Sequence, residues 1–249
     1  MRIAWISFDF GEYSICQANA LAVEHEVLLV LSAKEWCDPR CAVHPAVRHY
    51  HSEQPRLRQL FRQFGWIRRI IREVKEYRPD VIHFQHGHLW FNLALPVLRG
   101  FPLVVTIHDP RHHEGDAESR KVPQPMMDFG YRRADRVIVH GRSHVDVVHY
   151  EIGIPRDRIH VVPHVAIGDV VLDRGASEDR NTVLFFGRIW GYKGLEYLIK
   201  AEPLITSEIP DARIVIAGKG DDFDRYRRLM EDPAHFEVQD SWVSDDERS

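Results

Sequence analysis

Two short apolar runs with a helical pattern between them constrain the fold of this chain more than any other feature of its sequence. Residues 183–186 and 214–217 have the length and composition of buried parallel strands. The apolar residues between them recur on one helical face: Leu195, Leu198, Ile199, Leu204 and Ile205. This pattern predicts a strand–helix–strand unit with parallel strands, and hence a protein of the α/β class.

Each of the two predicted strands ends at glycine, Gly187 after the first and Gly218 and then Gly220 after the second. Ligands of open α/β sheets bind where strands end and helices begin. Arg188 and Lys193 lie in the first of these turns, and two cations beside a helix N-terminus are suited to a phosphate or diphosphate. The alternative is a pair of solvated surface charges, which is the usual state of a single arginine or lysine.

The string FFGRIWGYKGLEYLIKA (residues 185–201), followed by a proline turn and IVIAGKG, resembles the donor-side motif of GT-B glycosyltransferases, in particular the large retaining family four. The resemblance implies a GT-B fold with two Rossmann-like, parallel-sheet domains. It also implies that Arg188 and Lys193 hold the diphosphate of a nucleotide-sugar donor.

The rest of the chain fits this two-domain scheme. The pattern at the start of the chain predicts a strand, a helix and a second strand, over residues 2–8, 15–23 and 25–32, so the chain begins βαβ. We expect an N-terminal Rossmann-like acceptor-side domain over 1–167, a linker over 168–181 and a nucleotide-sugar-binding domain over 182–249. Members of the resembled family continue further and carry an E-x7-E glutamate pair, so we expect the second domain to be incomplete. The chain is then truncated, with weak or no activity alone, or is completed by a second chain.

The turn after the first predicted strand contains Gly11, followed by Glu12. In the resembled family this turn carries a glycine pair near the donor phosphates, which implies that Gly11 lets the backbone approach the donor diphosphate. The dinucleotide fingerprint G-x-G-x-x-G is absent here, which argues against an NAD-dependent oxidoreductase.

Histidines follow two further predicted strands. His108 and Asp109 end the apolar run 103–107, and His108 matches a histidine that the family places beside the transferred sugar and the acceptor. The resemblance implies a catalytic role for His108, with Asp109 and His86 lining the acceptor cleft. The alternative is that His108 only caps the end of the strand and takes no part in catalysis. From strand alternation we expect His83 to pack beneath the sheet, with His86 and His88 nearer the opening.

We expect no metal and no cofactor besides the nucleotide-diphosphate sugar. His83, His86 and His88 suit neither a helical H-x-x-x-H pair nor a zinc-finger pair, which argues against a metal hydrolase. Cys37 and Cys41 lack a second cysteine pair. The resemblance implies that Arg188 and Lys193 neutralise the charge of the diphosphate, a role that a metal ion would otherwise have.

Residues 54–78 form the most amphipathic segment of the chain. Its apolar positions are Leu57, Leu60, Phe61, Phe64, Ile67, Ile70, Ile71 and Val74. Its basic positions are Arg56, Arg58, Arg62, Arg68, Arg69, Arg72, Lys75 and Arg78. Two interpretations stay open: a helix that covers the sheet with a solvated outer face, and peripheral contact with anionic lipid headgroups.

Composition narrows the class of protein and its compartment. A net charge of −4 over 249 residues gives no reason to expect a nucleic-acid partner, and three cysteines argue against a disulfide framework. No apolar run approaches the roughly 20 residues of a membrane span, and Met1 and Arg2 lead straight into a strand without a secretory signal. We expect a cytoplasmic protein; under the second interpretation of residues 54–78, it contacts the inner face of the cell membrane.

The leading hypothesis is therefore a retaining glycosyltransferase of polysaccharide or glycan biosynthesis. It would transfer a sugar from a nucleotide-diphosphate donor to a glycan, polysaccharide or lipid-linked acceptor. The second hypothesis is a non-catalytic acceptor-binding or regulatory fragment of such an enzyme.

Overall fold

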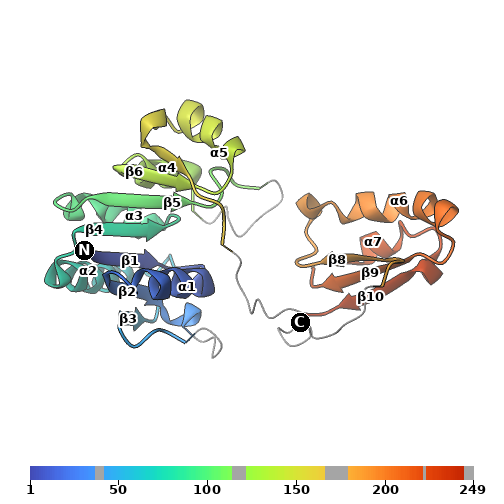
Figure 1. Cartoon of the computed structure of the whole chain (residues 1–249), viewed down its shortest axis with the longest axis horizontal. Coiled ribbons are helices and arrows are strands. Elements are labelled where there is room, and N and C mark those ends of the chain that lie inside the picture. Colours follow the sequence, from blue (N-terminus) through green and yellow to red (C-terminus); the bar gives the residue numbers. More distant parts are fainter. Residues whose placement is uncertain (37–41, 114–121, 166–178, 221–222, 244–249) are drawn as a thin grey trace. The chain divides into compact units, whose positions relative to one another are not determined.

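The computed structural model describes residues 1–36, 42–113, 122–165, 179–220 and 223–243. The chain divides into two compact units, Met1–His112 with Arg120–Val170, and His113–Ser119 with Val171–Ser249 (Figure 1). Each unit contains a parallel sheet with helices, which confirms the α/β class. Cys37, Cys41 and most of the predicted linker 168–181 lie outside the described residues.

The first unit is built on a seven-stranded parallel sheet in the order β3-β2-β1-β4-β5-β6-β7. The strands are β1 (Arg2–Ser7), β2 (Glu26–Ser32), β3 (Arg48–Ser52), β4 (Val81–Gln85), β5 (Leu103–Ile107), β6 (Arg136–Val139) and β7 (Ile159–Val161). The chain moves outward from β1 to β3 and then returns to β4 on the other side of β1. The carboxyl ends of β1 and β4 therefore flank the topological switch point where such sheets bind ligands.

Helices cover both faces of this sheet (Figure 1). They are α1 (Gly11–Leu21), α2 (Leu60–Tyr77), α3 (Leu89–Ala94), α4 (Gln124–Tyr131) and α5 (Arg142–Asp146). Side chains of α2, α3 and α4 share one core with Ile6 and Val30, whereas α1 packs on the opposite face against Trp5 and Leu29. The helix predicted over 15–23 thus begins four residues earlier, at Gly11.

Helix α2 buries a different stripe at its N-terminal end from the one that the pattern predicts. Ile67, Ile70 and Val74 are buried as expected. Leu60, Phe61 and Phe64 were expected on the same face, and this part of the prediction is wrong, because they are 55%, 95% and 72% exposed.

Two hydrogen bonds explain the rotation of this first stretch of α2. Gln63 donates from Nε2 to the carbonyl of Pro55 at 2.6 Å, and Trp66 donates from Nε1 to Oγ of Ser52 at 2.8 Å. Both Gln63 and Trp66 are buried. Their side chains take the core-facing positions, so the phenylalanines at 61 and 64 point to solvent.

The second unit contains a three-stranded parallel sheet in the order β10-β9-β8. Its strands are β8 (Thr182–Phe186), β9 (Arg213–Gly218) and β10 (Phe236–Asp240), and its helices are α6 (Leu195–Glu208) and α7 (Phe223–Arg227). Leu195 and Ile199 of α6 pack on Ile214 and Ile216 of β9. The predicted strand–helix–strand unit is confirmed.

Burial within this unit differs from the prediction at two places. In β8, Val183, Leu184 and Phe186 are 36%, 61% and 49% exposed, because β8 is an edge strand of the sheet in the described part of the chain. In α6 the buried face continues from Ile199 to Glu202, so Leu204 points to solvent and is 72% exposed.

Short helical turns complete the described chain: η1 (Ala33–Glu35), η2 (Leu95–Leu98), η4 (Val147–Glu151), η5 (Arg156–Arg158), η6 (Gly191–Lys193) and η7 (Pro233–His235). Among the described helices, none combines the length and the apolar character that crossing a bilayer requires.

Candidate functional site

In the second unit, the carboxyl ends of β8 and β9 lie side by side. The N–H of Gly187 donates to the carbonyl of Ala217 at 3.0 Å, and the N–H of Ile189 donates to that of Lys219 at 2.9 Å. Gly218 adopts φ +157°, and a Cβ at this position would lie 1.8 Å from the carbonyl oxygen of Gly187. Only glycine fits there, so the sequence fixes a close approach of the two backbones at the strand ends.

Arg188 and Lys193 lie on the turn that leads from β8 into α6, and both are exposed. The guanidinium of Arg188 lies 4.3 Å from the ring centroid of Trp190, and Nζ of Lys193 lies 5.1 Å from that of Tyr192. Neither cation forms an ion pair with a carboxylate in the part of the chain that the structure describes. Ring contacts therefore orient both cations, and neither has a carboxylate partner among the described residues.

Arg225 of α7 is a third cation at this turn, which the sequence reasoning missed. Its Nη2 lies 3.7 Å from where a Cβ on Gly191 would stand, and it donates to the hydroxyl of Tyr226 at 3.1 Å. The residue lies more than thirty positions after the turn in a short polar helix, so no local spacing connects the two. Lys219 is also near, but its charge is paired with Asp240 at 3.7 Å.

In the first unit, His108 follows β5 and is 8% exposed. Its ring stacks on Phe10 at a centroid distance of 4.0 Å. Its Nε2–H donates to Oε1 of Gln85 at 3.0 Å, and Nε2 of Gln85 donates to Oγ1 of Thr106 at 3.3 Å. Burial, followed by the neighbouring histidines, lowers the pKa of His108 to about 3. His108 is therefore a neutral imidazole at pH 7, with its proton on Nε2 and a lone pair on Nδ1.

The structure brings His86 and Asp109 to the same edge of the sheet as His108. His86 follows β4 with φ +56°, and its ring centroid lies 6.3 Å from that of His108. Burial lowers the pKa of His86, which the charges of Asp9 and Asp109 oppose. Asp109 is exposed. The three residues expected at the acceptor cleft thus occupy adjacent strand ends.

The prediction that His88 lies near the opening is wrong. It is 5% exposed and caps α3, where its Nδ1 accepts the N–H of Phe91 at 3.3 Å. The chain enters α3 directly after this residue, which turns the imidazole into the core. His83 behaves as expected, because its ring lies 4.0 Å from that of Trp5 on a face of the sheet.

Gly11 begins α1 and is buried. Its N–H donates to Oε2 of Glu35 at 2.9 Å, and a Cβ at this position would lie 2.3 Å from the carbonyl oxygen of Glu35. The close approach that requires glycine is therefore made by Glu35, within the same unit. The approach of Gly11 to a donor diphosphate stays a prediction.

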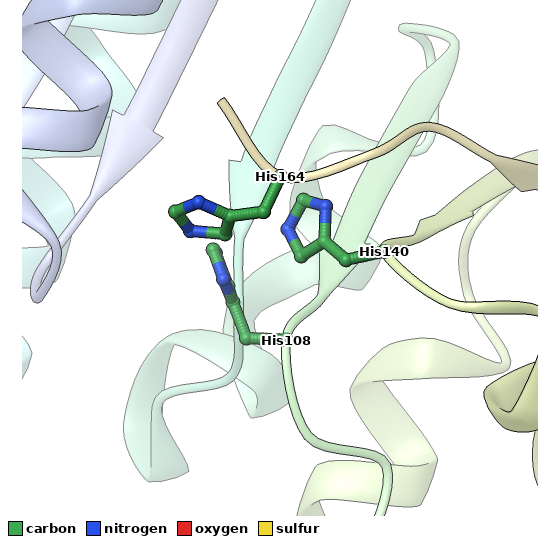
Figure 2. A group of neighbouring side chains, drawn as sticks. All are labelled: His108, His140 and His164. Atoms are coloured by element: carbon green, nitrogen blue, oxygen red, sulfur yellow. The ribbon is translucent and has the colours of Figure 1, made fainter. Parts of the chain in front are cut away.

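A cluster of three histidines, which we call the histidine cluster, lies at the carboxyl ends of β5, β6 and β7: His108, His140 and His164 (Figure 2). One ring nitrogen from each lies within 4.8 Å of the others. Local spacing along the sequence could not reveal this set, because each member follows a different strand. The signal available in the sequence was their shared position after consecutive apolar runs.

The two parallel sheets and the sites at their carboxyl edges define a GT-B-type α/β protein. The chain is similar in fold to sucrose-phosphate synthase of Thermosynechococcus elongatus, with a TM-score of 0.67 and 16% identity over 98% of this chain and 71% of that one. It is also similar to Anabaena Alr3699/HepE, solved in complex with UDP and glucose (TM-score 0.62, 14% identity, 98% and 70% covered). These likenesses show the fold.

The sequence families agree with the fold. The model of the glycosyl transferase 4-like domain matches residues 16–164, and that of glycosyl transferases group 1 matches residues 173–233. The chain belongs to the glycosyl transferase 4-like family, which confirms the resemblance seen in the sequence.

Two curated relatives match parts of the chain. Alpha-D-kanosaminyltransferase of Streptomyces kanamyceticus is 26% identical over an alignment of 175 residues, which covers 61% of this chain and 45% of that protein. The uncharacterized glycosyltransferase MJ1607 of Methanocaldococcus jannaschii is 49% identical over 47 residues, or 19% of this chain and 12% of the relative. The matches thus span less than half the length of either relative.

Proposed function

We propose that this chain serves sugar transfer from a nucleotide-diphosphate sugar to a hydroxyl group of a glycan, polysaccharide or lipid-linked acceptor, with retention of anomeric configuration. The observation that carries the proposal is the pair of exposed cations, Arg188 and Lys193, which ring contacts hold at a glycine turn before α6 and which form no ion pair among the described residues. Negative charge develops on the diphosphate as the sugar leaves, and fixed cations stabilise it without reorganisation.

Arg225 adds a third positive charge to the same turn. Three cations match the charge of a leaving nucleoside diphosphate, so the proposal places no metal ion on the diphosphate. Support for this donor class comes from the fold relative Alr3699/HepE, whose structure holds UDP and glucose.

On the acceptor side, the structure favours an orienting role for His108 over proton transfer. Its pKa of about 3 makes Nδ1 a weak base at neutral pH. The same lone pair accepts a hydrogen bond from the acceptor hydroxyl and fixes its direction. His86 and Asp109 on adjacent strand ends line the place where that hydroxyl would lie.

We further propose that the exposed side of α2 contacts an anionic membrane from the cytoplasmic side. Phe61 and Phe64 project into solvent, and Arg62, Arg68 and Arg69 on the same helix are exposed. Aromatic side chains at the interface together with basic residues favour binding to anionic lipid headgroups. This contact would bring the first unit to a lipid-linked acceptor.

The donor proposal is tested by titrating the full chain with UDP, GDP and ADP in a calorimeter. We expect one of them to bind, and Arg188→Ala to weaken it about tenfold to a hundredfold, because a charge-assisted hydrogen bond contributes roughly 1.5–3 kcal/mol. Lys200→Ala is the matched control, since Lys200 is an exposed cation on α6 that pairs with Glu196. Binding that Arg188→Ala leaves unchanged would contradict the proposal.

The same titration separates the two hypotheses from the sequence. Diphosphate binding together with sugar transfer to a hydroxyl acceptor supports the enzyme. Acceptor binding in the absence of diphosphate binding supports a non-catalytic module.

A further inference from the structure

We propose that the histidine cluster, His108, His140 and His164, is a binding site for a divalent transition metal, with Zn²⁺ as the ion that fits best. Figure 2 shows the three rings facing one another at the strand ends. They come from the ends of β5 and β6 and from the segment after β7, so the sheet itself holds two of the three in place.

Ring positions in the histidine cluster are close to those of a three-histidine zinc site. With Zn–N distances of about 2.0–2.1 Å and tetrahedral angles, ring centroids lie about 5 Å apart and the ligating nitrogens about 3.4 Å apart. The observed centroid distances are 4.7 Å between His108 and His140, 4.8 Å between His140 and His164, and 5.8 Å between His108 and His164.

The nitrogens lie within 4.8 Å of one another and need to close by up to about 1.4 Å to reach such distances. His164 can supply this movement because it is exposed and lies outside the strands. A movement of the His164 side chain leaves the sheet unchanged, because this residue lies outside the strands.

Hydrogen bonding leaves one ring nitrogen of each histidine available to a metal. Each ring donates its other N–H to an oxygen that can only accept: His108 Nε2 to Gln85 Oε1 at 3.0 Å, His140 Nδ1 to the Val162 carbonyl at 2.9 Å, and His164 Nδ1 to the Val165 carbonyl at 2.7 Å. Histidines that bind metals in proteins are held in this manner, with the non-ligating N–H bound to a carbonyl or carboxylate. The lone pairs therefore reside on His108 Nδ1, His140 Nε2 and His164 Nε2.

One of these lone pairs has no partner in the part of the chain that the structure describes. Nε2 of His140 is buried and has no hydrogen-bond partner among the described residues. A buried polar atom without a partner costs free energy, and this one lies in the group of three histidines. Coordination to a metal would satisfy it.

The chemistry of the donors selects the ion. Three neutral imidazoles suit zinc, copper, cobalt and nickel, whereas magnesium and calcium require oxygen ligands. Three protein ligands leave the fourth tetrahedral position for a water molecule or a substrate oxygen.

A bound metal would also regulate the proposed transfer, a consequence that rests on the proposed function. Nδ1 of His108 cannot coordinate a metal and accept a hydrogen bond from an acceptor hydroxyl at the same time. We therefore expect Zn²⁺ to compete with the acceptor and to inhibit transfer, without weakening the binding of the diphosphate by the second unit.

The site is tested on the untagged, metal-stripped full chain, without sugar nucleotide, so that failure of the proposed transfer does not affect the result. Zn²⁺ is titrated in a calorimeter, and Co²⁺ is followed by the visible absorption of a tetrahedral complex. We expect one equivalent to bind and the double variant His140→Gln/His164→Gln to lose at least tenfold in affinity together with the tetrahedral cobalt band.

The matched control is His160→Gln, which removes an exposed histidine of β7 outside the cluster. Circular dichroism verifies that all variants are folded. The proposal is overturned if the wild-type chain binds neither ion, or if the double variant binds both as tightly as the control does.

Discussion

His88 is expected to make the stability of the first unit depend on pH. Its ring is 5% exposed and lies against Phe8 and Trp66, at centroid distances of 5.1 and 5.5 Å. Its Nδ1 accepts the N–H of Phe91, which requires this nitrogen to be unprotonated. Burial lowers the pKa of His88 from 6.5 to about 4.

The sign and the size of the effect follow from these two pKa values. Because the pKa is lower in the folded state, the unfolded chain takes up the proton first, and stability is lost as the pH falls from 6.5 towards 4. Between pH 6.5 and pH 5, an interval of about 1.5 pH units, the imidazole is mostly protonated in the unfolded chain and mostly neutral in the folded one, so each unit of acidification lowers the free energy of unfolding. At roughly 1.36 kcal/mol per unit, the loss is about 2 kcal/mol.

The assay is urea unfolding at pH 7 and pH 5, followed by tryptophan fluorescence because Trp66 adjoins His88. The variant is His88→Asn, whose side-chain oxygen can still accept the N–H of Phe91 but which does not titrate. At pH 7 we expect the variant to be less stable than the wild type by about 1–2 kcal/mol, because ring contacts are lost. On acidification it should lose about 2 kcal/mol less than the wild type.

His160→Asn serves as the control, because it removes an exposed imidazole of β7 and leaves the core unchanged. The reasoning is refuted if the wild type and His88→Asn show parallel losses of stability between pH 7 and pH 5.

Three further outcomes are expected. Gly218→Ala should unfold the second unit or lower its stability by several kcal/mol, measured by urea titration, because the new Cβ would collide with the carbonyl of Gly187; stability within 0.5 kcal/mol of the wild type would contradict this. Arg225→Ala should weaken diphosphate binding in calorimetry, by a smaller factor than Arg188→Ala; an unchanged affinity would remove Arg225 from the site. Phe61→Ser/Phe64→Ser should abolish flotation with anionic vesicles at no cost in stability, because both rings are exposed; equal flotation of both forms would exclude α2 as the contact.

The parts of the fold that the sequence predicted correctly are those with strong local patterns. The strand–helix–strand unit around Arg188 and Lys193 is one example, since strand length, helical spacing and glycine positions all agree. The position of His108 at a strand end is another, because it depends only on where the apolar run 103–107 stops.

The errors arise where neighbours distant in the sequence decide burial. Phe61 and Phe64 fit an apolar stripe, yet hydrogen bonds from Gln63 and Trp66 to the preceding segment rotate the helix. Phe186 belongs to an apolar run that is typical of a buried strand, yet β8 is an edge strand among the described strands and the side chain is exposed.

The histidine cluster was missed for a related reason. His140 and His164 join His108 only because β5, β6 and β7 are adjacent in the sheet, and strand order is not a local property of the sequence.

The central claim is that Arg188 and Lys193 recognise a diphosphate. The most direct measurement compares the affinities for a nucleoside diphosphate and for the corresponding monophosphate, in the wild type and in Arg188→Ala/Lys193→Ala. The account predicts that the wild type prefers the diphosphate and that the double variant binds both forms equally. A double variant that keeps the full preference for the diphosphate would contradict the account.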